Sequence, residues 1–141
     1  MLANKKFIGV LILAVLFLTA CGAQGNSNNV TIALTEFGIE SSQTYFEVGV
    51  PYHFIVTNNG AVEHEIMLMA PLTEDQMKMN MDMAEMDKMA LAHVEASDLQ
   101  PGSTAEFDYT FTEPAPAGSL EFACHIPGHY EAGMELPITV K

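Results

Sequence analysis

The sequence has no arginine and few basic residues of any kind. Its five positive charges are all lysines, against eighteen Asp and Glu, and the formal net charge is −13. So acidic a protein repels nucleic acid, and we therefore expect no nucleic-acid partner. The same charge would attract a basic redox partner, although solubility alone also explains it.

Cysteine is scarce as well. The chain of 141 residues contains only Cys21 and Cys124, which excludes a disulfide-rich framework. The length also excludes two complete hydrophobic cores. We therefore expect a single domain after any leader segment.

No hydrophobic run is long enough to stay in a membrane. The apolar stretch 7–17 follows two lysines and leads into Leu-Thr-Ala-Cys at 18–21, which is the layout of a secretory signal peptide over residues 1–20. Leu-Thr-Ala-Cys resembles the lipobox of bacterial lipoproteins, which implies that Cys21 becomes the lipidated first residue of the mature chain. Ordinary secretion with a free Cys21 is the alternative.

Lipidation of Cys21 would leave Cys124 without a disulfide partner. An unpaired thiol outside the cell needs a function, and metal ligation supplies one. Residues 21–29 are small and polar, as in a flexible tether. We expect an extracytoplasmic protein held at the outer face of the cell membrane, or at the periplasmic side of a membrane, by its lipid.

Short runs rich in β-branched and aromatic residues, separated by turn residues, fill residues 30–141. We expect strands near 30–37, 43–48, 52–57, 64–69, 91–96, 104–112, 119–123 and 136–140, with a Pro-rich connection at 113–118. This pattern predicts an all-β domain, an antiparallel Greek-key β-sandwich.

A methionine-rich segment at 73–90 interrupts the strands. Thr73 and Gln76 form a capping-box pattern, which predicts one helix to about Ala90. Packing against the sandwich would use a broad face of Met79, Met83, Met86 and Met89, and it would leave Met77 and Met81 unexplained. A Cu(I) site to which His93 contributes, or a docking surface for partners, is the alternative.

The segment from Cys124 to Met134 carries the chemistry, because it places a thiol, an imidazole and a thioether at positions 124, 129 and 134. Sulfur ligands with imidazole select copper, and two His with one Cys and a weak axial Met form an electron-transfer copper site. The second imidazole has to come from elsewhere. His64 follows the probable turn Asn58-Asn59-Gly60 and precedes an apolar run, which offers a fixed strand end.

The Cys-x4-His-x4-Met spacing and the upstream Asn-Asn-Gly-x3-His resemble the cupredoxins, the blue copper proteins that include azurins, rusticyanin and auracyanins. The resemblance covers about Val30 to Lys141. It implies one type 1 copper ion, alternating between Cu(I) and Cu(II), held by His64, Cys124, His129 and Met134. By the same resemblance, His129 would be the electron port, with Ile126, Pro127 and Ala132 around it.

Two neighbours of the ligands differ from familiar patterns. Glu65 stands where many cupredoxins have an Asn that links the ligand loops. Ala123-Cys124-His125 resembles part of the His-Cys-His of multicopper oxidases, but five histidines in the whole chain are too few for a trinuclear cluster. His125 and His53 are therefore expected to be strand residues that do not bind this copper.

The sequence thus predicts a monomeric, membrane-anchored carrier of single electrons, not an enzyme, that serves a basic cytochrome, an oxidase or another membrane complex. The alternative is a copper-binding lipoprotein for copper acquisition, delivery or tolerance, with the methionine-rich helix as the entry site for Cu(I).

Overall fold

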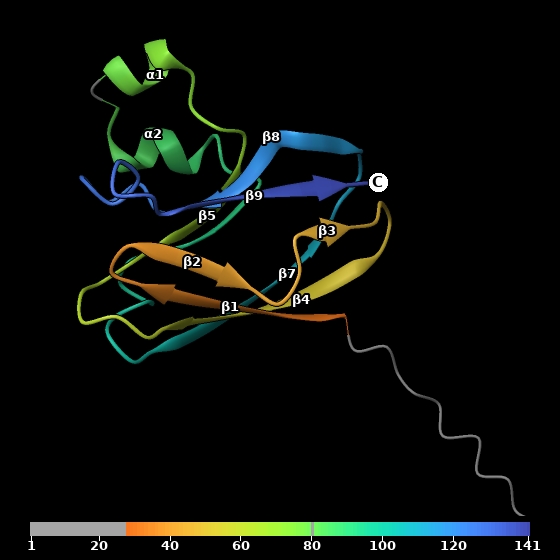
Figure 1. Cartoon of the computed structure of the whole chain (residues 1–141), viewed down its shortest axis with the longest axis horizontal. Coiled ribbons are helices and arrows are strands. Elements are labelled where there is room, and N and C mark those ends of the chain that lie inside the picture. Colours follow the sequence, from red (N-terminus) through yellow and green to blue (C-terminus); the bar gives the residue numbers. More distant parts are fainter. Residues whose placement is uncertain (1–27, 80) are drawn as a thin grey trace, which may run out of the picture.

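The computed structural model describes residues 28–79 and 81–141, which form two stacked β-sheets with a small helical insertion at one end (Figure 1). This architecture confirms the predicted β-sandwich. Cys21, the predicted signal peptide and most of the predicted tether lie outside the described residues. No helix in the described part of the chain combines the length and the apolar character needed to cross a bilayer.

Nine strands make up the two sheets. The first sheet has the order β2-β1-β4-β7, formed by β1 (Asn29–Thr35), β2 (Gly38–Ser41), β4 (Pro51–Asn58) and β7 (Thr104–Thr110). The second has the order β3-β9-β8-β5-β6, formed by β3 (Tyr45–Phe46), β5 (Ile66–Met69), β6 (Ala92–Val94), β8 (Ala115–Ala123) and β9 (Glu135–Val140).

Both sheets are mixed, which corrects the prediction of purely antiparallel pairing. β1 pairs with β4 in parallel, and β3 pairs with β9 in parallel. The chain leaves the first sheet after β2, adds β3 to the second sheet, and then returns as β4 beside β1. Because the chain passes through the second sheet between β2 and β4, β4 re-enters the first sheet parallel to β1. Strand propensity does not predict this direction.

Aromatic side chains fill the space between the sheets. Phe54 of β4 meets Phe122 of β8 with ring centroids 5.5 Å apart, and Phe46 meets Phe111 at 5.0 Å. All four rings are at most 2% exposed. Alternation along β4 and β7 points one side chain in two towards this core, as predicted for half-buried strands. The packed core holds the strand ends, and therefore the site, in fixed positions.

β8 begins earlier than expected. The Pro-rich stretch at 113–118 was predicted to be a connection, but strand pairing with β9 already starts at Ala115. A register shift between Ala115 and Leu120 interrupts the ladder and accommodates Pro116 at an exposed position. The strand then runs without interruption to Ala123, directly before Cys124.

The methionine-rich segment contains two short helices where one long helix was predicted. α1 spans Glu74–Lys78 and α2 spans Met83–Asp87. The capping box of Thr73 and Gln76 starts α1, and a second capping box, of Asp82 and Glu85, starts α2. The C-cap residue Met79 ends α1 with extended backbone angles, and Asp82, the extended N-cap residue of α2, starts a separate helix. Both helices lie over the end of the second sheet that carries the loop after β8 (Figure 1).

Candidate metal centre

The loop between β8 and β9 is held closed by its own backbone. The Cys124 N–H donates to the Met134 carbonyl at 3.1 Å, and the Met134 N–H donates to the His129 carbonyl at 3.1 Å. Gly128 and Gly133 have positive φ angles of 89° and 102°, which most other residues disfavour. Two strands therefore fix both ends of the loop, and its hydrogen bonds fix the middle.

His64 is positioned by the turn in front of it. The Asn58 side chain is fully buried, donates to the carbonyls of Val62 and Leu99 at 2.7 and 2.8 Å, and accepts from the Gly60 N–H at 2.8 Å. The His64 N–H also donates to the Leu99 carbonyl, at 3.2 Å. His64 lies just before β5 and is fully buried. Ile66 and Leu68 of that strand belong to the core cluster, as the alternation predicted.

Three of the four predicted ligands meet at this end of the sandwich. Nδ1 of His64 lies 3.2 Å from Nδ1 of His129, and Sγ of Cys124 lies 3.4 Å from the same His129 nitrogen. One donor atom from each residue falls within 4.8 Å of the others. Such spacings suit atoms that share an ion at about 2 Å from each nitrogen.

Burial governs the protonation of these donors. Burial raises the pKa of the Cys124 thiol, while hydrogen bonds from the backbone N–H groups of Glu65 and Ile126 act in the opposite direction. Burial and the neighbouring His129 lower the pKa of His64, which favours the neutral imidazole that binds metals. A bound metal ion would replace the thiol proton, and the N–H groups of Glu65 and Ile126 would then donate to the thiolate.

Glu65 connects the two ligand-bearing segments. Its carboxylate is 4% exposed and accepts the backbone N–H of His125 at 2.9 Å. Burial raises the pKa of Glu65 to about 7, against the opposing effect of this hydrogen bond. Glu65, which stands where many cupredoxins have Asn, therefore also links the two ligand segments, because it follows His64 and bonds to the residue after Cys124.

Met134 is fully buried at the end of the loop and belongs to the core cluster. Its backbone bonds to Cys124 and His129 place it beside two of the donors. Its role as the weak axial ligand stays a prediction. A donor set of two imidazoles and one thiolate, with a thioether available, fits copper better than hard cations such as Mg²⁺ or Ca²⁺, which prefer oxygen.

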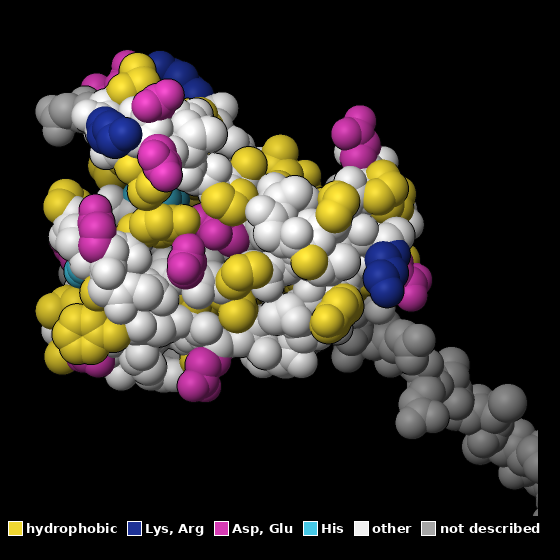
Figure 2. All heavy atoms as spheres, turned by 45° about the horizontal axis from the view of Figure 1, so that its top comes forward, with side chains coloured by type: hydrophobic (Ala, Val, Ile, Leu, Met, Phe, Trp, Pro, Cys, Tyr) yellow, Lys and Arg dark blue, Asp and Glu magenta, His cyan; other side chains and the backbone are white. Residues whose placement is uncertain are grey.

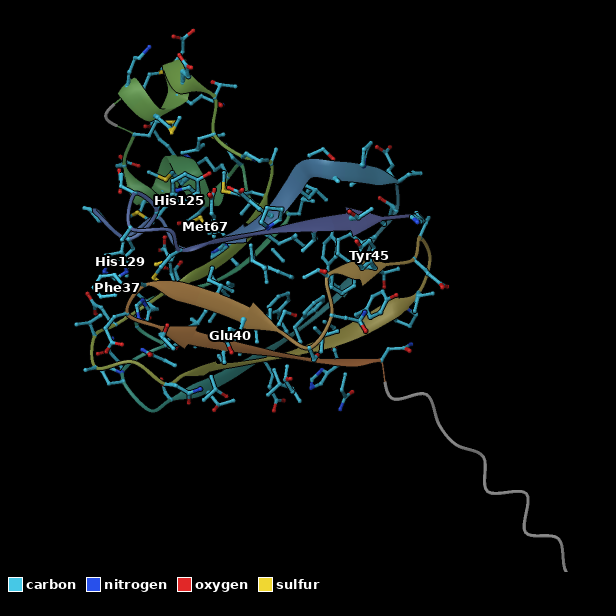
Figure 3. All side chains as sticks on the ribbon, viewed as in Figure 1. Phe37, Glu40, Tyr45, Met67, His125 and His129 are labelled. Carbon is cyan, nitrogen blue, oxygen red and sulfur yellow. The ribbon has the colours of Figure 1, made fainter. Side chains whose placement is uncertain are left out.

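The edge of the site contains an exposed aromatic residue that the sequence did not single out. Phe37, in the turn between β1 and β2, is 72% exposed, and its carbonyl oxygen would lie 3.9 Å from a Cβ atom at Gly133 of the ligand loop (Figure 3). Of the residues expected there, Pro127 and Ala132 are exposed and Ile126 is half-buried. The Phe37-Gly38 pair is a turn signal, but nothing in the sequence places that turn beside a loop ninety residues away.

The two remaining histidines of interest occupy different environments. His53 lies on β4 and pairs with Asp108 at 2.7 Å, far from the donors in the fold. His125 follows Cys124 but is turned towards the insertion, where Figure 3 shows it against α2. Neither belongs to the three-donor cluster.

The fold and the converging donors define a cupredoxin-type copper site. The chain has the cupredoxin fold. An auracyanin from Roseiflexus castenholzii superimposes with a TM-score of 0.62 at 21% identity, covering 83% of this chain and 99% of the auracyanin. Rusticyanin from Thiobacillus ferrooxidans gives a TM-score of 0.54 at 16% identity, covering 81% and 78%.

Two sequence relatives are named as copper-resistance proteins. A copper-resistant cuproprotein, CopI, from Rubrivivax gelatinosus is 37% identical over 93 residues, covering 66% of this chain and 53% of the relative. The CopI of Pseudomonas aeruginosa is 28% identical over 142 residues, covering 82% and 77%. The chain thus spans about half the length of the Rubrivivax protein. No protein-family model matches the sequence.

Proposed function

We propose that this protein binds one copper ion through His64, Cys124 and His129, with Met134 as the weak fourth ligand, and that it serves copper tolerance outside the cytoplasm. The observation that carries the proposal is the convergence of the three donors within 4.8 Å in a cupredoxin fold. The names of the sequence relatives support tolerance as the purpose. The protein acts by binding and one-electron redox change, and it is not an enzyme.

The chain's own groups suit such an ion. Bound copper supplies a one-electron couple, and the packed sheet ends hold the donors in one arrangement for both oxidation states. The N–H groups of Glu65 and Ile126 favour the thiolate form of Cys124. Burial of the thiol excludes water, which protects the sulfur from oxidation.

The site is tested by adding Cu(II) to the purified protein. We expect an intense absorption in the visible range from thiolate charge transfer, and Cys124→Ser should abolish it. Cys21→Ser is the matched control, because it removes the other thiol and should leave the colour unchanged. A colourless adduct of the unmodified protein would contradict the proposal.

Tolerance is tested in cells. A strain that lacks the protein should grow poorly in elevated copper, and the unmodified gene should restore growth. Cys124→Ser should not restore it. Cys21→Ser should restore growth less well if the lipid anchor that we propose at Cys21 keeps the protein at the membrane surface. Full rescue by Cys124→Ser would show that tolerance does not depend on this site.

Single-electron transfer is a second candidate, favoured by the half-buried His129 beside exposed Phe37. An apolar edge around one ligand allows a redox partner to approach the ion closely. The acidic surface, where Figure 2 shows many Asp and Glu and few Lys, favours a basic cytochrome. Rapid reduction by such a cytochrome that slows with added salt would support this role. Electron exchange that is slow at every salt concentration would argue against the carrier role and leave copper tolerance as the proposed function.

A further inference from the structure

A pocket of about 200 Å³ lies between the insertion and the loop after β8. Met77, Met79, Met81 and Met86 line the insertion side, and His125 and Tyr130 line the side of the loop. Figure 2 shows a histidine in the seam beneath the insertion, with hydrophobic side chains on both sides. The pocket therefore gathers four thioethers and one imidazole, and none of them is a donor of the three-residue cluster.

His125 is held in place but lacks a partner. Its side chain is 7% exposed, and its ring stacks on Tyr130 with centroids 4.7 Å apart and planes at 17°. Its backbone N–H is bonded to Glu65. Within residues 28–79 and 81–141, nothing forms a hydrogen bond with the buried Nε2 of this ring. A buried polar atom without a partner costs about 1–3 kcal/mol of stability, and a ligand bound to this nitrogen would remove that cost.

Packing explains only some of the methionines of the insertion. Neither α1 nor α2 contains a buried residue, and Met77 and Met79 are 53% and 62% exposed. The expected packing face is therefore corrected at Met79 and Met89, which are exposed, whereas Met83 and Met86 of that face are half-buried. Met67 and Met69 of β5 are the contrast, since each is only 1% exposed.

We propose that this pocket is a second copper site, selective for Cu(I), in which Nε2 of His125 and the thioethers of Met81 and Met86 bind the ion. Thioether sulfur is a soft, uncharged donor that prefers Cu(I) to Cu(II) or Zn²⁺. Met81 and Met86 are half-buried, whereas Met77 and Met79 stand at the exposed mouth. The last two therefore serve as the first contacts for an entering ion.

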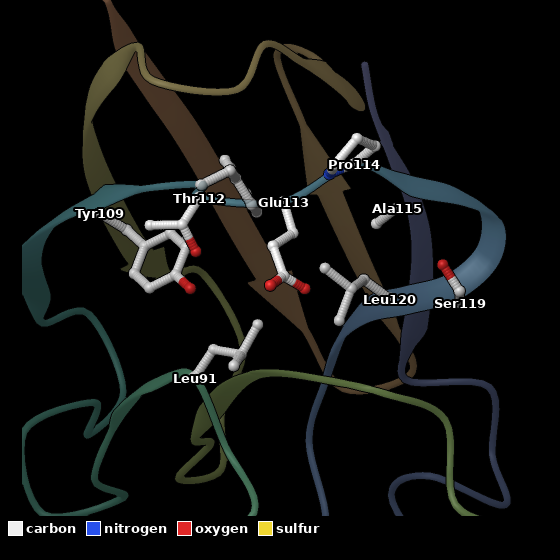
Figure 4. A pocket seen from close by; sticks show the side chains of 9 residues that line it. Leu91, Tyr109, Thr112, Glu113, Pro114, Ala115, Ser119 and Leu120 are labelled. Carbon is white, nitrogen blue, oxygen red and sulfur yellow. The ribbon is translucent and has the colours of Figure 1, made fainter.

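Other groups of possible metal ligands in the described part of the chain give weaker support for a metal site. Asp87, His93 and Glu95 bring donor atoms within 4.8 Å, but two of the three are exposed and His93 already pairs with Glu95 at 3.4 Å. His93 does not line the methionine pocket, which corrects its expected part there. A separate hollow beside Leu91 and Glu113 is lined by apolar, hydroxyl and carboxylate side chains and offers no sulfur or imidazole (Figure 4).

Counting the Cu(I) ions that the whole protein removes from a coloured Cu(I) chelator without oxygen tests the proposal. We expect two equivalents for the unmodified protein and one for the Met77→Leu/Met79→Leu/Met81→Leu/Met86→Leu variant. Leucine nearly conserves volume and lacks the sulfur donor. The matched control, Met83→Leu/Met89→Leu, changes two methionines of the same segment that do not line the pocket and should still bind two.

Two further variants separate the sites. Cys124→Ser should lose the visible absorption of Cu(II) and keep one Cu(I). His125→Phe retains an aromatic ring for stacking on Tyr130 and removes Nε2, so Cu(I) affinity at the second site should fall at least tenfold. Ag(I), a redox-inert soft ion, should shift the NMR methyl signals of Met81 and Met86 and leave those of Met67 and Met69 unchanged.

The two copper proposals fail in different ways. Three results would each overturn the second site while the coloured Cu(II) complex remains. They are binding of one Cu(I) by the unmodified protein, binding of two by the four-leucine variant, and binding of fewer than two by the control variant. A colourless Cu(II) adduct together with one Cu(I) bound in a methionine-dependent manner would overturn the type 1 site and support the second.

Discussion

The metal-facing end of the sandwich and the methionine-rich insertion are neighbours built on opposite principles. At the first, Cys124 and His64 are fully buried and the turn before His64 is tied by the Asn58 side chain. In the second, two helices of five residues each contain no buried residue. In the proposed functions, the first region would keep donors fixed for an ion that changes oxidation state, and the second would leave donors accessible to an entering ion.

The same residue type shows the difference. Met134 and Met67 are fully buried, and Met134 belongs to the core between the sheets, whereas Met77 and Met79 are more than half exposed. A thioether in the core contributes packing and a fixed position, but an exposed thioether gains little from burial. Position in the fold therefore decides what a methionine does in this protein, and the predictions below probe that contrast.

Asn58→Ala should have the largest effect on stability, because the Asn58 side chain ties the turn that precedes His64. The change removes three hydrogen bonds and leaves the carbonyls of Val62 and Leu99 without this donor. Each buried group without a partner costs about 1–3 kcal/mol, so we expect a loss of about 3 kcal/mol or more in denaturant unfolding. Copper affinity should fall as well, since His64 follows this turn. A change below about 0.5 kcal/mol would show that the turn does not depend on Asn58.

Gly60→Ala should disturb the imidazole directly. A Cβ atom at position 60 would lie 3.0 Å from Nε2 of His64 and 3.2 Å from Oδ1 of Asn58. Overpacking of this kind costs about 1–3 kcal/mol, and displacement of the ring should alter the visible spectrum of the copper complex. Gly118→Ala is the control for a loss of stability alone, because its φ of 81° strains an alanine while no atom lies within 4 Å of the added Cβ. It should lose stability and keep the visible spectrum unchanged. Unchanged spectra in both variants would contradict close packing at His64.

Glu121→Gln should change how stability depends on pH. Burial raises the pKa of this carboxyl, and the charge of Glu135 adds to the effect, although the Tyr130 hydroxyl donates to it at 2.9 Å. Above the ordinary pKa near 4.5, the unfolded chain releases a proton that the folded chain still holds, so stability falls as pH rises towards the folded pKa. The amide has no such proton. The advantage of the variant in unfolding free energy should therefore grow from pH 4 to pH 7, and a constant difference would contradict the assignment.

Thr73→Ala should have the smallest effect. It removes the capping box of α1, which is worth about 1 kcal/mol to an isolated helix end. Because α1 buries no residue, local loss of this helix should leave global unfolding within about 0.5 kcal/mol of the unmodified protein. The visible spectrum should also stay unchanged. A large global loss would show that the insertion supports the sandwich, and the contrast between the two regions would then disappear.

Part of this architecture could be predicted from local patterns. The alternation at 104–112 identified β7, and the capping box at Thr73 and Gln76 located the start of α1. The capping box of Asp82 and Glu85 marks the start of α2, so the segment predicted as one helix contains two. The pattern of the sequence does not predict β2, because four residues with a single buried side chain give a weak signal.

The sequence by itself determined the donor types and their spacing along the loop, since Cys-x4-His-x4-Met is local and copper selects those atoms. Only the tertiary structure decided that Nδ1 of His64 comes within 3.2 Å of Nδ1 of His129 and that Glu65 accepts the backbone N–H of His125. It also decided that four methionines line a pocket with His125, whose Nε2 has no hydrogen bond within the described part of the chain. The reason is physical. Local patterns fix which atoms a strand or loop presents, but the distances between segments far apart in the chain follow from how two sheets pack around one core.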